Sequence, residues 1–376
     1  MPSLAYATLA ATLVALAPTV AHGARCSLEG APSSLVLALA RGEELGRLAL
    51  SVAPDQTLWV SARVMPHRFA RRPRTRVLVG ALDPTRTRWS VAPLEVASLP
   101  GRSELPLALA SDNDGASVVI ARPASVIVVR VSRSEQLATE SLSLARPSTA
   151  SGPPLVDAQG SAIAVLWRSP RRLSFATSAS TASLRDLARF AHAPRSGALG
   201  LEDLCGLVAL SPTSAGAVFC QHSGALSIAS VERGAVTSRS VQPAHCPDHC
   251  ERVAVTSVSR GAVATFAMKV RGERLLRSHW ASRVSLDENS HTQSTIPILR
   301  GLAFTVGPHV DSIAQWSRPV VLRALERPIA LGPSVAMPRA INAIATSANT
   351  ALAVTALDQG ALSVATVRCE RSPASR

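Results

Sequence analysis

The stretch AHCPDHC, residues 244–250, brings together the side chains of this sequence that are best suited to hold a metal ion. His245 and Cys246 form one pair, His249 and Cys250 form a second, and the pairs are four residues apart. Imidazole and thiolate are ligands that zinc prefers. The alternative is a disulfide between the two cysteines, with two flanking surface histidines. To hold a metal, the four side chains would have to lie on one helical turn, and Pro247 argues against a helix there. Thiols also oxidise in an exported chain. We therefore favour the disulfide and expect no cofactor.

Motifs for the common catalytic chemistries are absent from the sequence. It contains no G-x-S-x-G elbow, no H-E-x-x-H, no P-loop and no dinucleotide-binding glycine pattern. The acidic stretch SDNDG, residues 111–115, lacks the further acidic ligands of a calcium loop, so we interpret it as a β-turn. The sequence therefore favours binding over catalysis.

Arginine is the charged residue in greatest excess. The formal net charge of the 376 residues is +14, and Lys269 is the only lysine. A basic balance favours anionic partners, because opposite charges steer association. The alternative is that arginine is simply the default surface residue of a GC-rich genome, and the sequence leaves both interpretations open.

Residues 1–23 read as a secretory signal peptide. An apolar run over 4–20 is followed by Ala21-His22-Gly23, a small-x-small cleavage pattern. The alternative is a retained membrane anchor, although 17 apolar residues broken by Pro18 are marginal for spanning a bilayer. No later segment is apolar enough to span. We therefore expect a bacterial, secreted or periplasmic monomer that binds an anionic polysaccharide, a lipid surface or an acidic protein, and no nucleic acid.

The chain is built from repeated short strands. The sequence GALSVATV at 360–367 recurs as GALSIASV at 224–231, with six of eight residues identical. Equivalent strands begin near Val77, Val126, Leu173, Leu226, Leu275, Val320 and Leu362, at spacings of 42 to 53 residues. Two further apolar strands precede each of them, and a less regular fourth follows. Short strands at regular spacing are typical of an all-β protein.

Four short strands in about 40–50 residues are typical of one propeller blade. The pattern resembles seven-bladed β-propellers of the WD-repeat and quinoprotein-like kind. It covers residues 24–369, which we interpret as a single domain followed by a flexible tail at 370–376. No WD dipeptide or tryptophan docking motif is present, so the resemblance names no family. The alternatives are a pair of β-sandwiches and a β-solenoid.

A propeller of this kind needs one more strand in its last unit, which ends at Val367 after three. The segment 33–41 is a spare N-terminal strand that could complete it and close the ring. Cys26 and Cys369 would then lie near each other, because strand ends meet in an antiparallel pair. We expect disulfides Cys26–Cys369, Cys205–Cys220 and Cys246–Cys250; the rival for the last two is Cys205–Cys250 with Cys220–Cys246.

Arginines gather in the connections between the second and third strands of the units. They are Arg68, Arg71, Arg72, Arg74, Arg122, Arg168, Arg171, Arg172, Arg271, Arg274 and Arg318. The opposite turns carry mainly aspartates. The sequence therefore predicts a binding or scaffold protein with a basic face. The alternative is a propeller enzyme, a glycan hydrolase or lyase, with its site at the mouth of the channel.

Overall fold

The computed structural model describes most of the N-terminal third of the chain and the strands of the remainder. The described residues are 25–31, 33–103, 106–122, 126–134, 137–140, 154–159, 162–169, 172–177, 181–183, 204–211, 213–220, 226–232, 235–241, 252–259, 262–271, 276–285, 292–298, 301–306, 309–315, 320–323, 328–330, 341–347, 350–356 and 360–370. They form 29 β-strands in seven antiparallel sheets and no α-helix.

Six of the seven sheets each consist of four antiparallel strands that are consecutive in the sequence. The first sheet contains β3 (Glu44–Val52), β4 (Leu58–Met65), β5 (Arg74–Leu82) and β6 (Trp89–Pro100). The second contains β7 (Leu107–Ser111), β8 (Gly115–Ala121), β9 (Val126–Ser132) and β10 (Leu137–Glu140). The third contains β11 (Leu155–Gln159), β12 (Ala162–Ser169), β13 (Arg172–Thr177) and β14 (Thr181–Ser183).

The later sheets repeat this arrangement. The fourth contains β15 (Leu204–Ser211), β16 (Ser214–Cys220), β17 (Leu226–Glu232) and β18 (Ala235–Val241). The fifth contains β19 (Arg252–Ser259), β20 (Ala262–Arg271), β21 (Leu276–Ser285) and β22 (Thr292–Ile298). The sixth contains β23 (Gly301–Val306), β24 (His309–Gln315), β25 (Val320–Arg323) and β26 (Pro328–Ala330). The seventh contains β27 (Ile341–Ser347), β28 (Thr350–Ala356) and β29 (Ala361–Glu370), together with β1 (Arg25–Leu28) and β2 (Ser33–Val36).

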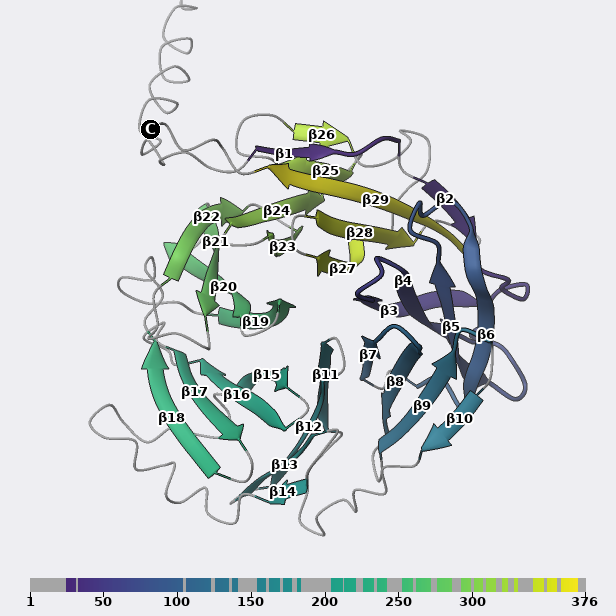
Figure 1. Cartoon of the computed structure of the whole chain (residues 1–376), viewed down its shortest axis with the longest axis horizontal. Coiled ribbons are helices and arrows are strands. Elements are labelled where there is room, and N and C mark those ends of the chain that lie inside the picture. The colour runs from purple at the N-terminus through teal and green to yellow at the C-terminus, as the bar shows by residue number, and fades with distance from the viewer. Residues whose placement is uncertain are drawn as a thin grey trace, which may run out of the picture.

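The sheets follow one another around a common centre (Figure 1). The innermost strands are β3, β7, β11, β15, β19, β23 and β27. Neighbouring inner strands are linked at two described places. The Ser51 and Ser111 hydroxyls, on β3 and β7, lie 2.7 Å apart. The Asp157 carboxylate on β11 accepts a 2.8 Å hydrogen bond from the backbone N–H of Ala209 on β15. Polar side chains on the innermost strands therefore join one sheet to the next.

Apolar residues cover both faces of the first sheet, because side chains alternate between the faces of a strand. Leu58, Val60 and Ala62 of β4 pack toward the seventh sheet, in one core with Leu362. Trp59, from the same strand, packs toward the second sheet in a different core. The continuous apolar run of β4 is therefore explained by burial on both sides.

The N-terminal segment pairs with β29, but as two short strands in place of the single strand expected over 33–41. β2 pairs along Ala361–Val364 and β1 along Val367–Glu370. β2 ends at Val36 because its partner strand begins at Ala361, opposite Val36; the Leu37 N–H makes one more bond, to the Gly360 carbonyl. The chain then turns at Arg41-Gly42, where Gly42 has a φ of 80°. The expected strand over 37–41 is therefore wrong.

The all-β, antiparallel character expected from the sequence is confirmed. Two details of the expectation change. Glu370 belongs to β29 and pairs with Arg25, so it is not part of a tail. Cys205 lies in a bulge of β15 between Leu204 and Gly206, so the ladder does not place it opposite Cys220. The predicted signal peptide at 1–23, residues 371–376 and the motif at 244–250 lie outside the described residues.

Candidate binding surface

The strand connections emerge at two ends of the sheets. We call the end that carries the turns 53–57, 83–88, 112–114 and 133–134 the hairpin end. We call the end that carries the loop 66–73 and the turn 41–43 the loop end. The two ends differ in how their charges are compensated, and this difference defines the candidate site.

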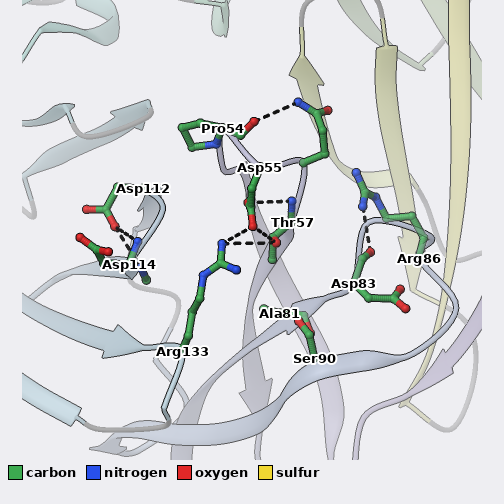
Figure 2. A network of polar contacts seen from close by, with 12 residues as sticks. Pro54, Asp55, Thr57, Ala81, Asp83, Arg86, Ser90, Asp112, Asp114 and Arg133 are labelled. Atoms are coloured by element: carbon green, nitrogen blue, oxygen red, sulfur yellow. Dashed lines mark hydrogen bonds and ion pairs between the residues drawn. The ribbon is translucent and has the colours of Figure 1, made fainter.

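At the hairpin end, charged side chains form a connected network (Figure 2). The Arg133 guanidinium, from the turn after β9, donates to the Asp55 carboxylate in the turn before β4. Asp55 also accepts the backbone N–H of Thr57 at 3.1 Å and its hydroxyl at 2.9 Å. The network therefore joins the first sheet to the second as well as closing a turn.

Two neighbouring turns are built in the same way. Asp112 accepts Arg130 Nη2 at 2.8 Å and the backbone N–H groups of Asp114 and Gly115 at 2.9 Å each. Asp83 accepts the Thr85 hydroxyl at 2.9 Å and Arg88 Nε at 3.2 Å. Aspartate suits these turns because its short carboxylate reaches backbone donors two or three residues further along. The carboxylate of each of these three aspartates therefore accepts hydrogen bonds from an arginine and from uncharged donors.

These contacts lower the pKa of Asp55 and Asp112. Burial alone would raise the pKa of Asp55, but hydrogen bonds from Arg133 and Thr57 outweigh burial. For Asp112, burial is likewise outweighed by the hydrogen bond from Arg130 and by the backbone N–H groups. Asp55 and Asp112 are therefore ionised and engaged, which leaves little of their charge for a ligand.

At the loop end, the β4–β5 loop has a fastened base. The Arg102 guanidinium reaches the Pro66 carbonyl at 3.5 Å and the Glu44 carboxylate at 3.0 Å. At the other side of the base, the Gly101 N–H donates to the Pro73 carbonyl at 2.8 Å. Both ends of the loop are thus held by the segment that follows β6.

The tip of this loop is ordered by a tight turn. The Ala70 N–H donates to the His67 carbonyl at 3.1 Å, and the Phe69 N–H donates to His67 Nδ1 at 3.3 Å. The His67 ring lies against Gly42, where a Cβ would come within 2.5 Å of the ring. The Phe69 ring, 5.6 Å from that of His67, is 86% exposed. A large aromatic side chain is thus presented to solvent by an ordered backbone.

Around Phe69 lie exposed cations without partners. Arg68, Arg71 and Arg72 make no hydrogen bond or ion pair within the described part of the chain. Nearby acidic residues are already used, since Glu43 binds Arg76 and Glu44 binds Arg102. Arg74 begins β5 and has only a 3.5 Å contact with the Ser98 hydroxyl. The positive charge of the loop tip is therefore uncompensated by its described neighbours.

Sequence reasoning missed two members of this surface, Arg41 and Phe69. Arg41 is exposed in the turn before β3 and has no partner among the described residues. It adjoins Gly42, on which His67 packs. We call Arg41, Arg68, Phe69, Arg71 and Arg72 the basic–aromatic tip. The Arg-Gly pair at 41–42 was an available turn signal.

The remaining predicted arginines are less informative. Arg122 follows β8 at the loop end and is only partly exposed, with its Nε buried. Arg168 and Arg172 lie at facing ends of β12 and β13, and Arg271 ends β20. Arg171, Arg274 and Arg318 lie outside the described residues, as do His245, His249, Cys246 and Cys250. The structure thus brings together the predicted arginines of the first sheet.

The described residues contain no group of three or more His, Cys, Asp or Glu side chains placed to hold a metal ion. They also include no helix with the length and apolar character that a membrane crossing requires.

Comparison with known proteins identifies no family. No family model matches the sequence, and no curated protein matches it. Among solved structures, a protein of unknown function from Dyadobacter fermentans is similar at a TM-score of 0.45 and 9% identity, over 90% of this chain and 98% of that one. Saccharomyces cerevisiae Sqt1 is similar at a TM-score of 0.45 and 10% identity, over 93% and 100%. Aleuria aurantia lectin, in complex with a fucosylated sugar, is similar at a TM-score of 0.37 and 11% identity, over 88% and 97%.

Proposed function

We propose that this protein is a seven-bladed β-propeller, closed by its N-terminal strands, that is exported and acts as a binding or scaffold module. Its anionic partner is held at the basic–aromatic tip. One observation carries this proposal. In the loop 66–73, exposed arginines without a partner among the described residues accompany the exposed Phe69. The described arginines of the hairpin end are instead engaged by aspartates or backbone carbonyls.

The physical basis is the uneven compensation of charge. An exposed ion pair already satisfies its guanidinium, so a ligand would have to compete with the partner carboxylate. Arg68, Arg71 and Arg72 have no such competitor among their described neighbours. An aromatic ring beside arginines adds apolar contact to the charge, as at the surfaces that bind lipid head groups or acidic polymers.

Binding to three anionic probes tests the proposal. Vesicles containing phosphatidylglycerol, a sulfated polysaccharide and an acidic peptide would each be titrated with the protein at rising salt, with phosphatidylcholine vesicles as the neutral reference. We expect at least one anionic probe to bind, with affinity that falls as salt rises, because exposed charges are screened. Salt-independent binding, or no binding to any anionic probe, contradicts the proposal.

Variants locate the binding surface. Each arginine near an anionic surface contributes about 1 kcal/mol, so the triple variant Arg68→Gln/Arg71→Gln/Arg72→Gln should bind roughly 100-fold more weakly. The matched single variants are Arg68→Gln and Arg88→Gln, which remove equal charge from opposite ends; Arg88 is 82% exposed. We expect only the first to weaken binding, and equal effects would argue for net charge alone.

The alternative is a glycan hydrolase or lyase. Asp157 is an acidic side chain on an inner strand, and its carboxylate accepts a hydrogen bond from the backbone N–H of Ala209. Such an enzyme would use a pair of ionisable groups at its site.

A further inference from the structure

The first and last described strands of the chain place two cysteines opposite each other. In the ladder between β1 and β29, Cys26 is the direct partner of Cys369. The ladder is regular on both sides of this pair, since Arg25 faces Glu370 and Ser27 faces Arg368. Two cysteines far apart in sequence are thus brought into register by the pairing of strands.

The hydrogen-bonding phase of the ladder determines how close this pair lies. Glu29 continues the register opposite Thr366, and the Glu29 N–H donates to the Thr366 carbonyl at 2.8 Å. Directly opposed residues that exchange such bonds alternate along an antiparallel ladder with residues that do not. Counting back from Glu29, the pair Cys26/Cys369 is one of the non-hydrogen-bonded pairs.

Non-hydrogen-bonded pairs have the shorter Cα separation, about 4.5 Å, with the side chains closer together. This separation lies within the range of about 4.4–6.8 Å that a disulfide spans. We propose that Cys26 and Cys369 are joined by a disulfide that links β1 to its neighbouring strand β29. This inference goes beyond the proposed binding function and does not depend on it.

Forming the bond removes one proton and one electron from each thiol and joins the two sulfur atoms. The electrons pass by thiol–disulfide exchange to a disulfide of an oxidising oxidoreductase, which is reduced to its dithiol form. A bond of this kind persists in an oxidising compartment and is rare in the cytosol. It would therefore link the architecture of the seventh sheet to export of the chain.

The structure also shows why a covalent link matters here. The outer strand of the seventh sheet is two four-residue pieces, β1 and β2, separated by residues 29–32. Leu35 anchors β2 in an apolar core, whereas β1 pairs with β29 through a ladder of four residue pairs. The bond would add a covalent tie between β1 and β29 to this short ladder.

Peptide mapping of the full chain, produced by export and digested with trypsin without reductant, tests the proposal. Cleavage after Arg25, Arg41, Arg368 and Arg371 places Cys26 in peptide 26–41 and Cys369 in peptide 369–371. We expect these two peptides to be recovered as one linked species that separates on reduction. Recovery of either cysteine alkylated, or linked to one of the other four cysteines, would overturn the proposal.

Thermal unfolding provides a second test. A bond that closes a loop of this length should raise the unfolding temperature by roughly 10 °C. The variants Cys26→Ala, Cys369→Ala and the double variant should all lose the same amount, because each removes the same bond. Additive losses would show two independent side-chain effects and contradict the bond. Binding of the anionic probe should survive in all three, so the outcome is separate from that of the proposed function.

Discussion

At the scale of single residues, Asp55 combines two tasks in one turn. Its carboxylate holds the turn before β4 through Thr57 and accepts Arg133 from the second sheet. The loss of this side chain therefore removes a local contact and a contact between sheets.

The Asp55→Asn variant should be less stable at neutral pH by about 1 kcal/mol, the scale of a partly exposed ion pair with an additional hydrogen bond. The pKa of Asp55 is lowered in the folded protein, so its contribution is fully present above the ordinary pKa of 3.8. It is lost as the pH falls through the lower, folded-state pKa. Urea unfolding at pH 7 and pH 2.5 should show a gap in unfolding free energy between wild type and variant that is smaller at the lower pH.

Asp114→Asn is the matched control for this experiment. Asp114 is exposed in the neighbouring turn, and its described contacts are made through the backbone. Neutralising it changes the net charge by the same amount as Asp55→Asn. Equal destabilisation by the two variants would show that the network at Asp55 is unimportant.

Gly115 is required by a close approach of two strands. A Cβ at this position would lie 2.1 Å from the Val131 carbonyl oxygen and 3.0 Å from Ser132 Cα, both backbone atoms that cannot move alone. Gly115→Ala should cost about 1–3 kcal/mol, as overpacking does. In Gly46→Ala the nearest atom belongs to the flexible Arg63 side chain, at 3.0 Å, so a smaller loss is expected. Chemical unfolding of both variants checks the order.

At the scale of elements, β2 contributes to stability through one face only. Leu35 lies opposite Leu362 and is buried in the core between the seventh and first sheets, whereas the next residue, Val36, is 67% exposed. Leu35→Ala should lower the free energy of unfolding by about 2–5 kcal/mol. Val36→Ala, two methyl groups removed from the same strand, should change it by no more than about 0.5 kcal/mol.

Denaturant unfolding of these two variants tests whether β2 is seated as described. Similar losses from both would mean that the strand has no fixed inner face. A small loss from both would mean that the strand is not needed by the seventh sheet.

At the scale of the whole molecule, most strands could be predicted from the sequence. Apolar runs such as 58–64 are interrupted by short polar turns, and successive side chains of a run then alternate between the two faces of the strand. The single strand expected over 33–41 was wrong, because an apolar run does not reveal where a partner strand begins. Only the register shows that Ala361 lies opposite Val36 and leaves Leu37 at the edge.

The candidate site was predictable in part, and for a similar reason. The gap between the apolar runs of β4 and β5 exposes Arg68, Arg71 and Arg72, as expected. Whether an arginine is free or paired depends on residues distant in sequence. Glu43 pairs with Arg76, 33 positions away, and Asp55 pairs with Arg133, 78 positions away. Composition cannot distinguish these cases. An exposed Phe69 runs against the usual burial of aromatic residues, so no pattern indicates it.

The pairing of β2 with β29 also has a consequence for how the protein is made. Ser33 and Val364 are 331 positions apart, so the seventh sheet joins two segments that leave the ribosome at widely separated times. Until translation passes Ala361, Leu35 and Leu37 have no β29 to cover them, and an exposed apolar strand edge invites aggregation. The pairing of β1 and β2 therefore waits for the synthesis of β29, and a chain cut before Ala361 would leave both strands without that partner.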